Sequence, residues 1–83
     1  MLINIVGGPR QISLEVDPED TIDNVKTRLY EQLSRNNWIT KNTAEEDLKL
    51  SYGPKRLKGF QTLKELEIED EDVITVNKTY FAA

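Results

Sequence analysis

The sequence contains neither cysteine nor histidine. Without cysteine, the chain can form no disulfide, no thiolate metal site and no cysteine nucleophile. Without histidine, it lacks the usual general base near neutral pH and the commonest metal ligand. We therefore expect a protein that is not an enzyme and that needs no metal or other cofactor.

Long apolar segments and excess positive charge are missing as well. No apolar run approaches the roughly 18 residues that span a bilayer. The first residues, Met1–Val6, lack the basic start and the small-residue cleavage site of a signal peptide. The formal net charge is −4, whereas a nucleic-acid-binding domain normally presents a basic face. These absences predict an intracellular protein that binds neither membranes nor nucleic acids.

The residues that are present suffice for one small domain. The chain has 83 residues, of which 37% are hydrophobic, enough for one packed core and too many for wholesale disorder. It shows no internal repeat, no low-complexity tract and no linker. We expect a single, monomeric domain over residues 1–83.

The first half of the chain predicts a hairpin followed by a helix. Two runs of alternating apolar residues flank the turn-rich segment Gly7–Arg10, a pattern typical of half-buried antiparallel strands. After Asp17–Asp20 breaks the second strand, Thr21 offers a hydroxyl that can cap a helix, with Asp23 placed favourably in the first turn. The predicted buried positions are Met1, Ile3, Ile5, Ile12, Leu14 and Val16 in the strands and Ile22, Val25, Leu29, Tyr30 and Leu33 in the helix.

The second half predicts the rest of a sheet. The expected strand positions are Leu48, Leu50 and Tyr52, then Leu57 in a short edge strand, and finally Val73–Val76. Capping-box spacing at Thr43–Glu46 and Thr62–Glu65 predicts two short helical turns. This order predicts an α+β fold in which one main helix crosses a mixed four- to five-stranded sheet whose first and last strands are parallel and central.

Two stretches of the chain resemble a known family. Leu14–Lys26 is similar, almost letter for letter, to the second strand, turn and helix start of the ubiquitin family, and the similarity resumes at Leu48 and continues without a gap to Ala83. Relative to that family, the first hairpin turn is one residue shorter and an insertion follows the helix within about residues 34–47. The resemblance implies the β-grasp fold. That fold serves modifiers, proteasome-shuttle domains and adaptors alike, so function has to be argued from the residues.

The resemblance also locates the family's contact face. The positions of its apolar recognition patch are occupied here by Ser51, Asn77 and the Gly7–Pro9 turn, so all three apolar side chains are missing. The basic position beside the patch is Lys49, and Thr75 stands at the histidine position. Because a buried aliphatic side chain contributes about 1.5–3 kcal/mol, we expect ordinary ubiquitin receptors not to bind this chain.

The C-terminal tail and the lysines bear on conjugation. Ala82 and Ala83 stand where conjugated members of the family carry Gly-Gly, and a Cβ there should clash in the narrow channel of the activating enzyme. Two accounts fit: a non-conjugated protein or domain, which we favour, or a Gly-Gly tail replaced to block chemistry. Lys26 and Lys55 fall on the family's chain-linking positions, and we interpret them as solvated surface lysines.

Three aromatic residues have two readings each. Trp38, within the insertion, either covers the lower end of the helix or anchors a partner. Tyr80 and Phe81, beyond the last strand, form either an interface or a frayed tail.

Our leading hypothesis is a non-catalytic, ubiquitin-like protein–protein interaction module. The alternatives are a divergent modifier conjugated through its C-terminus and the N-terminal domain of a larger shuttle or adaptor protein. The expected partners are other proteins, bound through Lys49, Ser51, Thr75, Asn77, Trp38, Tyr80 and Phe81.

Overall fold

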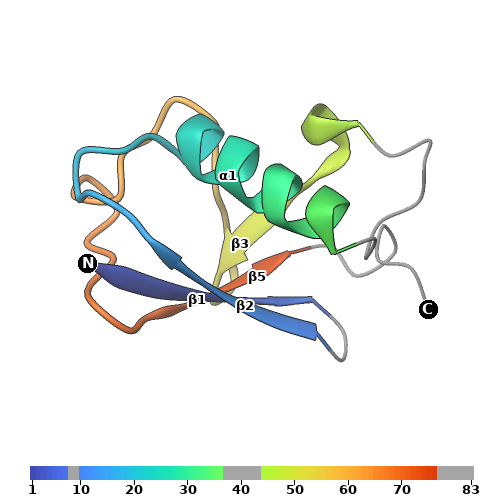
Figure 1. Ribbon diagram of the computed structural model, residues 1–83. Coiled ribbons are helices and arrows are strands. Elements are labelled where there is room, and N and C mark those ends of the chain that lie inside the picture. The colour runs from blue at the N-terminus through green and yellow to red at the C-terminus, as the bar shows by residue number, and fades with distance from the viewer. Residues whose placement is uncertain (8–9, 37–43, 77–83) are drawn as a thin grey trace.

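The computed structural model describes residues 1–7, 10–36 and 44–76. In this part of the chain, one helix crosses one face of a five-stranded mixed sheet of order β2-β1-β5-β3-β4 (Figure 1). The elements are β1 (Leu2–Gly7), β2 (Arg10–Glu15), α1 (Ile22–Arg35), the short 3-10 helix η1 (Glu45–Asp47), β3 (Leu50–Tyr52), β4 (Lys55–Arg56) and β5 (Val73–Val76). The predicted α+β, β-grasp architecture is confirmed.

The predicted hairpin is formed by β1 and β2. The strands pair antiparallel from Leu2↔Glu15 to Gly7↔Arg10. The apolar partners Ile3 and Leu14 face the core and are 0% and 6% exposed. Because side chains alternate between the two faces of a strand, the intervening residues of the hairpin lie on the opposite, outer face of the sheet.

The first and last strands are neighbours, as predicted. Strand β5 pairs in parallel with β1, with Ile74 opposite Ile5. Parallel pairing requires a crossover connection, which here contains α1 and the residues up to β5. Figure 1 shows α1 lying over one face of the sheet. The buried side chains of α1 belong to the hydrophobic core.

Helix α1 begins where the sequence predicts. The Thr21 side chain accepts a hydrogen bond of 3.2 Å from the Asn24 backbone N–H, so the expected N-cap is present. The helix ends at Arg35, and the N–H of Asn36 caps it by donating to the Gln32 carbonyl at 3.1 Å. The fully buried stripe of the helix consists of Ile22, Val25, Leu29 and Leu33.

The edge of the sheet differs from the prediction. The edge strand β4 consists of Lys55–Arg56, and Leu57 is not part of it. Gly53, at φ 62°, makes a tight turn after β3, and only two residues then pair before the chain bends inward. Leu57 is consequently buried at 7% exposure, while its N–H donates to the Leu50 carbonyl at 3.0 Å. The third strand also starts later than predicted, at Leu50 rather than Leu48.

Both predicted helical turns are present, one of them shifted. Thr62 and Glu65 form the expected capping box, with side-chain-to-backbone distances of 3.0 and 3.3 Å. In η1 the capping carboxylate is that of Asp47, which accepts the Ala44 N–H at 2.9 Å, one residue later than predicted. Ala44 supplies no side-chain acceptor in return, so only this half of the box is formed. Thr43 lies outside the described residues.

The core lies between α1 and the inner face of the sheet. Fifteen buried hydrophobic residues form it, and eleven of them have large side chains that are less than 2% exposed. No helix in the described ranges is long and apolar enough to cross a membrane. Among the described elements, no helix lies over the opposite, outer face of the sheet (Figure 1).

Candidate interaction surface

A row of aligned residues crosses the outer face of the sheet. Strand register places Val6 between Gln11 of β2 and Thr75 of β5. Thr75 in turn lies opposite Ser51 of β3, and Ser51 lies opposite Arg56 of β4. Residues paired across neighbouring strands share a face and lie about 4.5–5.5 Å apart. The row therefore brings together side chains from all five strands.

The surface of the sheet is hollowed where this row crosses β5, β3 and β4. A hollow of about 320 Å³ is lined by Lys49, Ser51, Arg56, Thr75 and Val76. Three of these, Lys49, Ser51 and Thr75, are residues that the sequence predicts for the contact face. The structure thus places them around one depression, although their role in binding stays a prediction.

Arg56 completes the hollow and was missed by sequence reasoning. Its position opposite Ser51 follows from the turn at Gly53–Pro54, which folds β4 back on β3. A two-residue turn places the second residue after it opposite the second residue before it, which here pairs Arg56 with Ser51. Using this signal requires the end of β3 to be known.

The hollow carries positive charge. Two of its five lining residues are cationic and none is acidic. The Lys49 ammonium group has a long contact of 3.4 Å with the Glu46 carbonyl oxygen. Among the residues that the structure describes, Arg56 makes no ion pair and no side-chain hydrogen bond. Its guanidinium group is therefore available to a ligand.

The acidic turn before β5 is organised by its own hydrogen bonds. The Asp72 carboxylate accepts the Tyr52 hydroxyl at 2.6 Å and the Glu69 N–H at 2.8 Å. The backbone hydrogen bond from Glu69, followed by that from Tyr52, lowers the pKa of Asp72. The bond to Asp72 in turn raises the pKa of Tyr52. Asp70 accepts the Leu2 N–H at 2.6 Å, so the turn is fastened to β1 as well.

The bonds of Asp70 and Asp72 fasten the turn to its neighbouring strands, which accounts for this acidic cluster. The described ranges contain no group of three or more acidic side chains that could hold a metal ion.

The comparison with known families decides the classification. The Ubiquitin family sequence model matches residues 4–79. The chain belongs to the ubiquitin family. No curated protein matches the sequence at a significant level.

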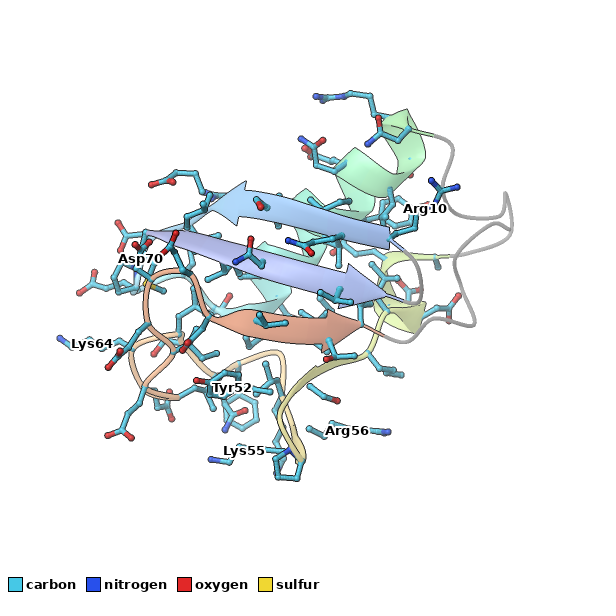
Figure 2. The ribbon with its side chains drawn as sticks, turned by 90° about the horizontal axis from the view of Figure 1, so that it is seen from below. Arg10, Tyr52, Lys55, Arg56, Lys64 and Asp70 are labelled. Atoms are coloured by element: carbon cyan, nitrogen blue, oxygen red, sulfur yellow. The ribbon has the colours of Figure 1, made fainter. Side chains whose placement is uncertain are left out.

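The two lysines at chain-linking positions of this ubiquitin-family chain have different surroundings. Lys26 lies on α1 with its side chain 18% exposed and its ammonium group 3.7 Å from the Asp23 carboxylate. Lys55 is exposed on β4. Figure 2 shows the Lys55 side chain pointing away from that of Arg56.

Several predicted contact residues cannot be placed on this ubiquitin-family fold. Trp38, Asn77, Tyr80 and Phe81, together with the tail residues Ala82 and Ala83, lie outside the described residues. Their proposed roles stay predictions. Two exposed apolar side chains were not singled out from the sequence: Phe60 is 72% exposed and Val73 is 51% exposed. Isolated exposed apolar residues are common and do not by themselves mark a site.

Proposed function

We propose that this member of the ubiquitin family is a non-catalytic module that binds other proteins through the outer face of its sheet, between β3 and β5. The observation that carries the proposal is the hollow lined by Lys49, Ser51, Arg56 and Thr75. It lies where the family resemblance locates the contact face. Polar groups that converge in a depression can fix the orientation of a bound molecule.

The chemistry of the residues supports binding rather than catalysis. The sequence has no histidine and no cysteine, so the common acid–base and nucleophilic groups are missing. The perturbed pKa values of Tyr52 and Asp72 are explained by their bond to each other and by the turn at Glu69. Such values mark catalytic groups only when a structural ion pair or hydrogen bond does not account for them.

The polar character of the face supports a partner set different from that of ubiquitin itself. Ser51 stands at a position where the family's receptors meet an aliphatic side chain, and Thr75 stands at the histidine position. Helical receptors gain their affinity by burying apolar side chains in that patch. We expect this chain to be recognised through hydrogen bonds and charge instead.

The proposal is tested by site-specific photo-crosslinking. A photoreactive amino acid is placed at Ser51 or at Thr75, with Lys64 as the control position. Figure 2 shows Lys64 well separated from Arg56, on the same side of the molecule as Asp70. In extract of the cells that produce the chain, we expect adducts from Ser51 and Thr75 that excess unmodified protein suppresses.

The captured protein is then purified and titrated into isotope-labelled chain. The proposal predicts that backbone resonances of Lys49, Ser51, Arg56 and Thr75 shift. Adducts formed equally from Lys64, or resonance changes confined to α1, would contradict it.

A further inference from the structure

The hollow between β3 and β5 differs in charge from the molecule that carries it. The chain has a formal net charge of −4, yet the lining of the hollow contains a lysine and an arginine and no carboxylate. Lys49, Arg56 and Thr75 are exposed and Ser51 is half-buried, so all four side chains are accessible. A local reversal of sign of this kind selects for ligands of the opposite charge.

The strand register determines how these groups are spaced. Ser51 lies opposite Thr75 on one side and opposite Arg56 on the other. Two hydroxyl groups therefore lie beside one guanidinium group along a single row. Arginine presents its N–H groups as a planar fork that matches a carboxylate, and hydroxyl groups donate to or accept from peptide groups.

Resting on the interaction role proposed above, we propose that the hollow binds an acidic segment of a partner protein. One carboxylate of the segment pairs with Arg56 and another with Lys49. Ser51 and Thr75 hydrogen-bond to the backbone of the segment between those two side chains. The volume of about 320 Å³ is close to the lower limit of protein ligand sites, which suits a few residues of an extended chain.

Other anionic partners fit this surface less well. Nucleic acids and anionic membranes gain affinity from many basic residues acting together, and the hollow supplies two on a chain of net charge −4. A second copy of this chain could offer the acidic turn before β5, whose carboxylates are partly engaged. The carboxylates of Asp70 and Asp72 in that turn already accept hydrogen bonds from Leu2, Glu69 and Tyr52.

The test is an NMR titration of the isotope-labelled protein with short capped peptides. One peptide alternates glutamate with serine, and its matched control alternates glutamine with serine. The proposal predicts saturable shifts at Lys49, Ser51, Arg56 and Thr75 with the glutamate peptide and none with the glutamine peptide. Because the contacts are charged and exposed, affinity should also fall as salt is added.

Charge-reversal variants locate the binding site. R56E and K49E should each weaken the binding of the glutamate peptide by about tenfold, since each replaces an attraction by a repulsion. K55E is the matched control because Lys55 is adjacent in sequence, equally charged and directed away from Arg56 (Figure 2). K64E is a second control, because Lys64 is well separated from Arg56 (Figure 2). Both control variants should bind the peptide as the unmodified protein does.

Three outcomes would overturn the acidic-segment proposal. K55E or K64E could weaken binding as much as R56E, which would mean that overall charge governs it. Duplex DNA, or vesicles containing phosphatidylserine, could shift the same resonances at lower concentration than the peptide. The peptide could fail to bind while crosslinking from Ser51 still captures a partner in the R56E background. In that third case the interaction role stands and the acidic chemistry is rejected, so the two proposals fail separately.

Discussion

The hydroxyl of Tyr52 and the carboxylate of Asp72 are joined by a hydrogen bond of 2.6 Å. The same carboxylate oxygen accepts the Glu69 N–H at 2.8 Å. Tyr52 ends β3, and Asp72 immediately precedes β5, where its carbonyl oxygen accepts the Asn4 N–H at 2.9 Å. One residue thus ties β3 to the start of β5, the two strands that carry Ser51 and Thr75. We infer that this link sets the alignment of the hollow.

Removal of the Tyr52 hydroxyl should loosen the two strands. Tyr52→Phe keeps the ring and loses the bond to Asp72, so we expect a lower midpoint of urea unfolding. A double-mutant cycle with Asp72→Ala measures the coupling, because the hydroxyl contributes nothing once its acceptor is gone. If Tyr52→Phe is equally destabilising in both backgrounds, the hydroxyl acts through another group.

Acid should weaken the fold through Asp72. Its folded-state pKa lies below the ordinary value of 3.8, mainly because of the Glu69 N–H and then the Tyr52 hydroxyl. As the pH falls, the unfolded chain therefore binds a proton at Asp72 before the folded chain does. The stabilisation contributed by the Asp72 carboxylate is present above pH 3.8 and is lost as the pH falls through the folded-state pKa. Urea midpoints of the unmodified protein and Asp72→Asn should differ at neutral pH and converge in strong acid. A difference between the two urea midpoints that stays constant with pH would contradict this expectation.

Alkali should act in the opposite sense through Tyr52. Its pKa is raised above the ordinary value of 10.0 by the bond to Asp72, so its stabilisation is present below that pH and is lost above it. The ultraviolet absorbance titration of the folded protein should lose a component that ionises above pH 10.0 in Tyr52→Phe. A titration curve that keeps this component in the variant would contradict the expectation.

The N-cap of α1 should be worth about 1 kcal/mol of unfolding free energy. Thr21→Ala removes the acceptor that Asn24 N–H uses at 3.2 Å, and Thr21→Ser retains it. Chemical denaturation should therefore show a clear loss for the alanine variant and almost none for the serine variant. Equal losses in both would assign the effect to the Thr21 methyl group instead.

The side chain of Asp23 on α1 lies close to Gly59. A Cβ at this position would lie 2.6 Å from Cγ of Asp23, so the Asp23 side chain has to move. That side chain is 67% exposed and can do so, although it would leave its contact with Lys26. We expect Gly59→Ala to cost less than about 1 kcal/mol. The cost should disappear in an Asp23→Ala background, and a cost that persists there would indicate backbone strain.

The two lysines at chain-linking positions should differ in reactivity. Lys55 is exposed, whereas the Lys26 side chain is 18% exposed and faces Asp23. An acylating reagent under limiting conditions should modify Lys55 before Lys26, as read by mass spectrometry of peptides. In Asp23→Asn the rate at Lys26 should rise and the rate at Lys55 should not. Faster modification of Lys26 in the unmodified protein would contradict the described packing.

Local features of the fold could be read from the sequence because they depend on near neighbours. The cap at Thr21 and the box at Thr62–Glu65 join residues three positions apart. The buried stripe of α1 follows from the helical repeat, and the alternation of β1 and β2 follows from the strand repeat. The family resemblance led to Lys49, Ser51 and Thr75, which the structure places around one hollow. Their role as a contact face stays a prediction.

The sequence by itself determined that this chain forms an α+β domain of the ubiquitin family, because its hydrophobic periods, caps and motif all agree. The tertiary structure alone decided that Arg56 joins Ser51 and Thr75, that Leu57 turns into the core, and that Asp72 holds Tyr52. These relationships depend on which residues become partners across different strands and turns. Pairing of that kind is set by where each strand stops and by how the core closes, and no local pattern records it.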